Sequence, residues 1–272
     1  NSRVVITFTD NVNSNYGTAI VGTVSGTSVS FGTEAVFESA TTSYSVPVHD
    51  VGANKIVIQY IDNGNSSYGT GVVGTVDPSD NSISFGTPSV YNSSLQYGDG
   101  TIVYDSTNNK TVFLFNDYAD GEKGKAIVVS VSGTSISYGT EVTFESQKGP
   151  RIAATFDSNI GKVAVGYYDE TPTNMRHITG TVSGTDISFG SELDITSDNA
   201  QPSSGAAAFD PNTGKVLYAV RNVTNSDNPY AAVVQVGGDS TDAPLTSENF
   251  IGFADAAYAD GQKATVKTTG SI

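Results

Sequence analysis

Apolar residues fall at alternating positions along short stretches of this chain, and turn-forming residues separate the stretches. Arg3 to Asp10 is rich in β-branched and aromatic residues, and in residues 29–37 the side chains of Val29, Phe31, Ala35 and Phe37 fall on one face by alternation. A period of two is typical of a strand with one buried face. No segment shows the 3.6-residue period of a helix. The pattern therefore predicts an all-β protein of short antiparallel strands.

One stretch, residues 22–33, recurs along the chain at a nearly constant interval. It contains a Ser-Gly-Thr sequence that favours a tight hairpin turn, followed by an aromatic residue. This aromatic residue is Phe31, Phe85, Tyr138 or Phe189, and the three successive intervals are 54, 53 and 51 residues. A fixed interval of this length indicates a repeat architecture.

A second turn, of the form Asp-x-x-x-Gly/Asn-Lys, recurs at residues 50–55, 105–110, 157–162 and 210–215. Only Asn or Gly precedes the lysine, at Asn54, Asn109, Gly161 and Gly214. These residue types favour a left-handed backbone conformation at the end of the turn. An aspartate at the start of such a turn can accept hydrogen bonds from the backbone that follows it.

Four short strands in each repeat of about 52 residues are typical of a β-propeller. The sequence predicts five units, at about 1–42, 43–92, 93–146, 147–198 and 199–238. In the first two units we expect a strand over 29–37, a loop over 38–42 and a strand over 43–49. Small residues in 151–157 and 204–210 predict that these strands lie innermost.

The first unit lacks an inner strand and the last unit lacks an outer strand. The preferred arrangement is a ring closed by pairing of the two termini, because closure removes exposed strand edges. The alternative is completion by a neighbouring copy of the chain. Residues 239–272 depart from the repeat, and we expect them to form one or more closing strands or to begin a further module.

The amino-acid composition limits the classes of partner and the kinds of site that we expect for this chain. Its net charge is −15, from 13 basic and 28 acidic residues. Nucleic acid and anionic membrane surfaces attract basic proteins, so neither is an expected partner. No apolar run approaches the roughly 20 residues of a membrane helix. The absence of cysteine excludes a disulfide framework and thiol chemistry. We expect no cofactor and no metal site.

The variable loops of the five units should share one face, because alternate connections of an antiparallel unit emerge at the same end. These loops are 10–17, 62–69, 117–124, 169–176 and 222–230. Binding residues are often found on loops that a rigid scaffold holds. Exposed tyrosines could stack on a sugar or contact a protein, or could instead pack over their own strands. The candidate ligand-binding residues are Asn15, Tyr16, Asn65, Tyr68, Tyr118, Asp120, Asn174, Arg176, Asn228 and Tyr230.

Residues 61–76 and 132–140 resemble repeats of tail-fibre and virion-surface proteins of tailed bacteriophages, and similar repeats occur in bacterial surface proteins. The resemblance implies an extracellular or virion-surface location and a structural or receptor-binding role. It brings no catalytic residues.

Three functions remain open. The first is a non-enzymatic surface module that binds a cell-surface glycan or protein through the variable-loop face. The second is a self-assembling filament subunit completed by strand exchange. The third is a glycan-active enzyme, which would need two carboxyl groups about 5 to 10 Å apart. The only histidines, His49 and His177, lie in different units, and we assign no catalytic residue.

Overall fold

The computed structural model describes residues 3–96, 98, 100–148, 151–171, 173–196, 199–223, 228–235, 253–254 and 266–267. Its regular elements are β-strands, apart from the three-residue 3-10 helix η1 (Asn63–Asn65), and the all-β prediction is confirmed. Among the described residues, no helix has the length and apolar character needed to cross a membrane. The predicted role of 239–272 lies outside the described residues, except for the short antiparallel pair β22 (Phe253–Ala254) and β23 (Val266–Lys267).

The first two units share one antiparallel sheet. Its eight strands are β1 (Arg3–Asp10), β2 (Tyr16–Ser25), β3 (Ser28–Phe31), β4 (Ala35–Asp50), β5 (Lys55–Asp62), β6 (Tyr68–Val76), β7 (Ile83–Phe85) and β8 (Ser89–Leu95). The long strand β4 joins the units, because its first half pairs with β2 and its second half pairs with β5. Strand β1 is at one end of the strand order in this sheet.

Units 3, 4 and 5 form separate antiparallel sheets. Unit 3 contains β9 (Thr101–Asp105), β10 (Lys110–Asp117), β11 (Lys123–Ser132), β12 (Ser135–Tyr138) and β13 (Val142–Glu145). Unit 4 contains β14 (Ile152–Asp157), β15 (Lys162–Glu170), β16 (Thr173–Ser183), β17 (Asp186–Phe189) and β18 (Leu193–Asp194). Unit 5 contains β19 (Ala200–Asp210), β20 (Lys215–Asn222) and β21 (Asn228–Gln235).

Two strand predictions for the first units were wrong. The expected strand over 29–37 is divided into β3 and β4, and the expected loop over 38–42 lies inside β4. The division begins at Gly32, which closely approaches the next unit. Residues 38–42 contain neither glycine nor proline, so nothing in their sequence forces the chain out of an extended conformation.

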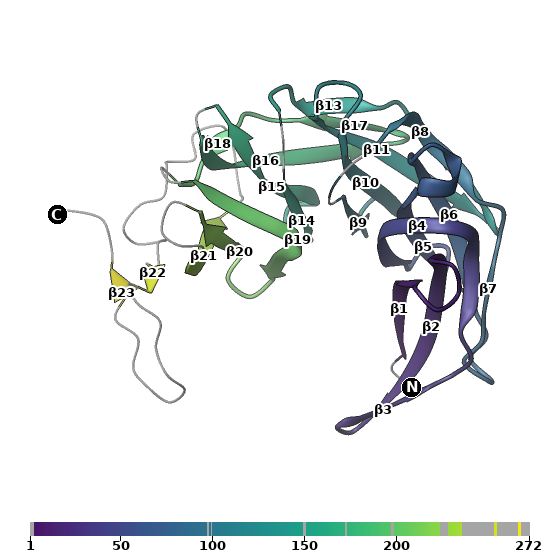
Figure 1. Ribbon diagram of the computed structural model, residues 1–272. Coiled ribbons are helices and arrows are strands. Elements are labelled where there is room, and N and C mark those ends of the chain that lie inside the picture. Colours follow the sequence, from purple (N-terminus) through teal and green to yellow (C-terminus); the bar gives the residue numbers. More distant parts are fainter. Residues whose placement is uncertain are drawn as a thin grey trace.

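The sheets follow one another around an open arc (Figure 1). The sheet of β1 lies at one end of the arc and β20 and β21 lie at the other. Strands β9, β14 and β19, each at the inner edge of its strand order, face the inside of the arc (Figure 1). The small-residue stretches 151–157 and 204–210 correspond to β14 and β19, so these strands lie on the inside of the arc as predicted (Figure 1).

The buried core lies between successive units. Each unit has a leading face, which packs on the preceding unit, and a trailing face, which packs on the following unit. In β10, Phe113 belongs to the cluster shared with unit 2, whereas Val112 and Leu114 belong to the cluster shared with unit 4. Two further clusters join unit 1 to unit 2 and unit 4 to unit 5. A central sheet is thus buried on both faces, which explains why its second strand is apolar at consecutive positions.

The regular turns have the predicted geometry. The φ angles of Asn54, Asn109, Gly161 and Gly214 are 51°, 51°, 65° and 66°. The lysine that follows has a role that the sequence pattern did not predict. Lys55, Lys110 and Lys162 donate hydrogen bonds to hydroxyl groups of the neighbouring strand, at Thr75 (2.8 Å), Ser130 (2.6 Å) and Thr181 (2.5 Å). These three turns are therefore held to the third strand of their own units.

A contact between units requires the glycine after the repeated aromatic residue in units 2 and 3. A Cβ on Gly86 would lie 2.1 Å from the backbone oxygen of Thr134, and one on Gly139 would lie 1.8 Å from that of Thr185. Thr134 and Thr185 lie in the hairpin turns of the next unit. These distances are far below a normal van der Waals contact, so the hairpin of one unit fits only against a glycine of the unit before it.

This contact predicts that Gly139→Ala lowers the free energy of unfolding by about 2 kcal/mol, because the added methyl group separates two packed units. Gly190→Ala is the matched control, since Gly190 makes the same backbone hydrogen bond in its unit and an added Cβ would meet only Thr179, at 3.4 Å or more. We expect the control to change that free energy by less than about 0.5 kcal/mol. Urea denaturation measures both variants, and equal losses would contradict the contact.

Candidate functional site

The variable loops are rigid at their starting points. Four of them begin with an aspartate whose carboxylate accepts a backbone N–H from the loop itself. These backbone hydrogen bonds run from Val12 to Asp10 (3.0 Å), from Asn65 to Asp62 (3.1 Å), from Asp120 to Asp117 (3.2 Å) and from Thr171 to Asp169 (2.8 Å). Such bonds fix the backbone that leaves the strand, so the loops differ in sequence but share one anchoring device.

Hydrogen bonds also join the loops of units 1, 2 and 3 side by side. They run from Thr42 N to Asn15 O (3.0 Å), from Ser43 Oγ to Asn63 Oδ1 (2.8 Å), from Asn63 Nδ2 to Ser67 Oγ (3.2 Å), from Gln96 N to Ser67 O (2.9 Å) and from Ala119 N to Leu95 O (3.3 Å). The three loops and the strand ends between them therefore form one continuous surface, which we call the loop face.

An exposed apolar patch lies on the loop face. Tyr44, Leu95 and Tyr118 are 44%, 44% and 45% exposed. The hydrogen bond from Ala119 N to the Leu95 carbonyl places the backbone segments that carry Leu95 and Tyr118 side by side. Tyr44 lines a cavity of about 10 Å³ together with Gln96, the residue after Leu95. We call Tyr44, Leu95 and Tyr118 the loop-face patch. No space for a small molecule lies in a cavity of this size.

Sequence reasoning identified Tyr118 but missed Tyr44 and Leu95. Tyr44 has a φ of 52°, an uncommon conformation for a bulky residue. It lies in β4 where the pairing with β5 is irregular, between Ser43 and Val46. Strained backbone often accompanies a functional site. No signal in the sequence marks the position, because residues 43–49 have the composition of an ordinary strand.

The other candidate residues have different surroundings. Asn15 and Asn65 are exposed, and Tyr16 and Tyr68 are partly buried at the first positions of β2 and β6. Asn174 is buried, so its side chain is not displayed on the surface. Asn228 and Tyr230 belong to β21, but their side chains lie outside the described part of the structure.

Asp120 belongs to a cluster of ion pairs around Lys125. The Lys125 Nζ atom lies 3.0 Å from Asp117 Oδ2, 2.8 Å from Asp120 Oδ2 and 2.7 Å from Glu141 Oε1. Hydrogen bonds from Lys125 and Lys123 hold the pKa of Asp120 below its usual range. Burial alone would lower the pKa of Lys125, but its hydrogen bonds to Asp120, Glu141 and Asp117 raise that pKa above the ordinary value.

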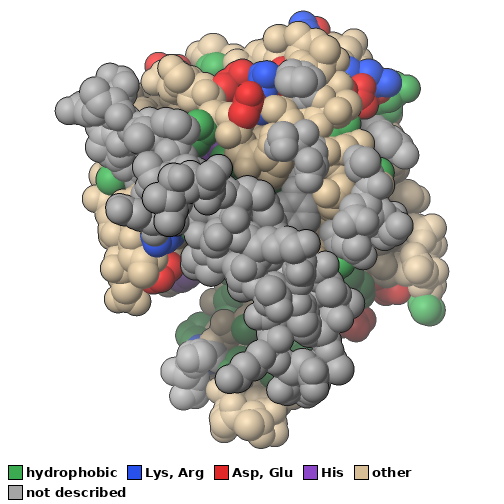
Figure 2. Space-filling model, turned by 90° about the vertical axis from the view of Figure 1, so that its left-hand side faces the viewer, with side chains coloured by type: hydrophobic (Ala, Val, Ile, Leu, Met, Phe, Trp, Pro, Cys, Tyr) green, Lys and Arg blue, Asp and Glu red, His purple; other side chains and the backbone are tan. Residues whose placement is uncertain are grey.

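Arg176 forms the corresponding cluster in unit 4. Its guanidinium contacts Asp169 at 2.9 Å, Glu192 at 2.6 Å and Asp194 at 3.0 Å. Arg176 lies opposite Tyr167 and Lys125 lies opposite Phe115, so the two cations occupy the same position in their units. Figure 2 shows acidic and basic side chains interleaved along the upper edge of one side of the molecule. Asp120 and Arg176 are thus engaged within the fold, which sequence spacing did not predict.

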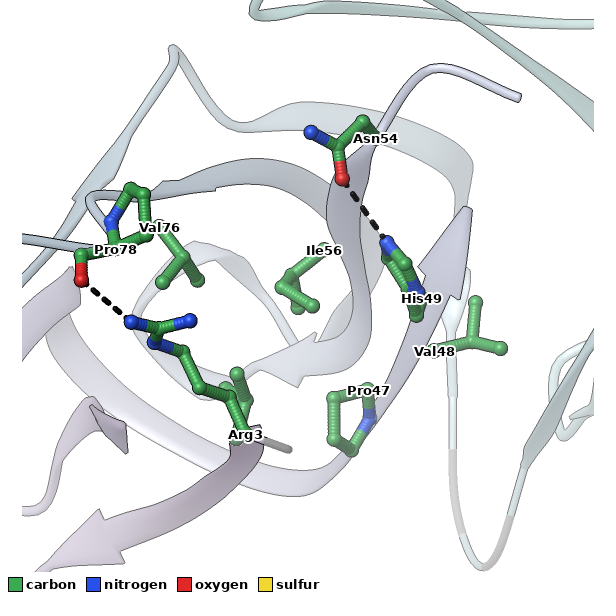
Figure 3. Close-up of a pocket in the computed structure, with 9 residues that line it drawn as sticks. Arg3, Pro47, Val48, His49, Asn54, Ile56, Val76 and Pro78 are labelled. Atoms are coloured by element: carbon green, nitrogen blue, oxygen red, sulfur yellow. Dashed lines mark hydrogen bonds between the residues drawn. The ribbon is translucent and has the colours of Figure 1, made fainter. Parts of the chain in front are cut away.

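A larger cavity lies away from the variable loops, between units 1 and 2. Its volume is about 510 Å³, and its walls include Val5, Pro47, His49 and Ile56 (Figure 3). It borders β1, which ends the strand order of its sheet, whereas β5, β10, β15 and β20 each pair with an inner strand as well. The cavity therefore lies where the other units place a strand.

No arrangement for acid–base catalysis is evident at the histidines. His49 Nε2 lies 3.4 Å from Asn54 Oδ1 at the rim of the larger cavity (Figure 3). His177 is buried, and its Nδ1 atom lies 2.9 Å from the Tyr218 hydroxyl group. Burial lowers the pKa of His177 to about 4, so the ring is neutral at physiological pH. In the described residues, no group of three or more acidic or histidine side chains is placed to hold a metal ion.

Glu145, like Asp62 and Asp157, is a buried carboxyl group whose pKa is raised by burial, as the pKa of a catalytic acid often is. Burial raises its pKa, the Gln147 backbone N–H opposes the rise, and the nearby Asp169 raises it further. However, Glu145 is only 2% exposed, so a glycan could reach it only after the units had separated.

A scan against protein-family models finds no match to this chain, and a search of curated proteins finds none either.

The cluster around Lys125 predicts that Lys125→Met lowers the free energy of unfolding by about 3 kcal/mol, because three carboxylates then lose their shared cation. The side chain of Lys123 is 36% exposed and contacts Asp120 alone in the cluster. We therefore expect Lys123→Met to change that free energy by less than about 0.5 kcal/mol. Chemical denaturation at neutral pH distinguishes the two variants. Equal changes in the free energy of unfolding would mean that the ion pairs of Lys125 do not stabilise the fold more than the exposed Lys123 does.

The lowered pKa of His177 predicts that the free energy of unfolding depends on pH. Its folded-state pKa of about 4 lies below the ordinary 6.5, so its contribution is complete above pH 6.5 and is lost as the pH falls toward 4. The loss between pH 7 and pH 5 should be about 2 kcal/mol. Unfolding of the wild type and of His177→Asn is compared at both pH values. A difference between the two proteins that stays constant with pH would contradict the assignment.

Proposed function

We propose that this chain is a non-enzymatic structural and receptor-binding module of an extracellular or virion-surface protein, such as a phage tail fibre. Its loop face would bind a cell-surface glycan or protein. The observation that carries the proposal is the lateral hydrogen bonding of the first three variable loops, which presents the loop-face patch as one surface.

A surface of this kind suits a macromolecule better than a small metabolite. The patch residues are exposed, and the cavity beside Tyr44 has a volume of only about 10 Å³. Tyrosine and leucine side chains offer apolar area that loses little conformational freedom on binding. Loops that are already fixed by Asp10, Asp62 and Asp117 avoid much of the ordering cost of association.

We further propose that the five units stack as the blades of a β-propeller-type scaffold. The two-sided burial of the central sheets supports this arrangement, because each sheet then packs between two others. The resemblance to phage tail-fibre repeats supports the surface location. A glycan-active enzyme is the weaker reading, because Glu145 is buried and Arg176 is held by three carboxylates.

The test is binding of the fluorescently labelled chain to whole bacterial cells and to an array of bacterial surface polysaccharides. For Leu95→Ser combined with Tyr118→Ser, we expect binding to fall at least about tenfold, because the apolar contact area is removed. The control combines Val51→Ser with Ile160→Ser, which alters exposed residues of the regular turns on the opposite face. Binding that survives the first variant, or that the control abolishes, would refute the role of the loop face.

A further inference from the structure

The leading face of unit 1 is apolar but uncovered. Val4, Ile6, Val29 and Phe31 are 38%, 44%, 45% and 53% exposed. The residues at the same positions in unit 2 are Ile56, Ile58, Ile83 and Phe85, and these pack against unit 1 in a buried cluster. Strand registers fix the equivalence, since Ile6 pairs with Ile20 just as Ile58 pairs with Val72. Unit 1 thus carries the leading face of an interface without the preceding unit.

The trailing face of unit 5 is also exposed at the residues that the structure describes there. Leu217 is 44% exposed, and Ala219 and Ala231 are also exposed. Leu217 pairs with Val233, as Val57 pairs with Val73 in unit 2. Leu217 therefore occupies the position that Val57 fills in the buried cluster between units 2 and 3.

The four internal interfaces show which residues these two faces would bring together. At each interface, the residue equivalent to Leu217 shares a cluster with the residue equivalent to Ile6. The pairs are Val5 with Ile58, Val57 with Phe113, Val112 with Val165, and Ala164 with Tyr218. The two terminal faces are therefore the complementary halves of an interface that the chain already forms four times.

We propose that the leading face of unit 1 binds the trailing face of unit 5 in a second copy of this chain, with Ile6 of one copy against Leu217 of the other. A second copy is favoured because the two faces lie at opposite ends of the open arc (Figure 1). The contact is heterologous, so it continues head to tail, and the assembly keeps one free face at each of its two ends. This association does not involve the loop face and goes beyond the proposed binding function.

The first experiment measures mass by sedimentation velocity across a wide concentration range. The wild type should associate as its concentration rises, and Ile6→Glu should remain a monomer, because a carboxylate would be buried without a partner. Ile6 is exposed in the single chain, so the substitution leaves the fold intact. Val12→Glu, at an exposed position in a variable loop, is the control and should associate like the wild type. A wild type that is monomeric at every concentration, or an Ile6→Glu variant that still associates, would overturn the proposal.

The second experiment uses the absence of cysteine from the chain. Ile6→Cys and Leu217→Cys are made separately and mixed under mild oxidation. The mixed disulfide should form about tenfold faster than the one between Val12→Cys and Leu217→Cys, because docking raises the effective concentration. Equal rates would overturn the proposal. So would a disulfide that closes within a single chain of the double variant at high dilution, since the chain would then close its own ring.

Discussion

The packing of each sheet face against the next is the constraint on which the rest of the structure depends. One repeat unit cannot bury its apolar faces alone, and repeat folds obtain their stability from contacts between neighbours. Here the contact has two parts, an apolar cluster between the sheets and a hairpin turn that fits against glycine. Gly86 and Gly139 set how closely the units approach, and the side chains around Val57 and Phe113 fill the space between them.

This packing positions the loops and leaves the ends open. Because the second and third strands of every unit are antiparallel, the connections between them emerge at one end. They lie outside the clusters between units and can vary in sequence without disturbing the core. Their aspartates and the bonds between units 1, 2 and 3 convert separate loops into one surface. The same packing requires a partner on both faces of a sheet, and among the described residues unit 1 packs only on unit 2.

The local features of the fold could be predicted from the sequence, whereas contacts between distant residues could not. The period and the left-handed positions at Asn54 and Gly161 follow from residue types within a few positions of one another. The break at Gly32 depends on Asn81, in the next unit. Arg176 and Asp120 were predicted as exposed binding residues, but their partners, such as Glu192 and Lys125, are identified only once strands pair. Tyr44 was missed because its strain arises from an irregular strand pairing.

The most direct test of this account is hydrogen–deuterium exchange of the monomeric chain, measured peptide by peptide. Strands β2, β6, β11 and β16 have the same place in their units, and each pairs with strands on both sides. If stacking between units determines local stability, β2 should exchange much faster than β11 and β16, because the leading face of unit 1 is exposed. Equal protection of β2 and β11 would show that strand pairing alone stabilises the units, and would contradict the account.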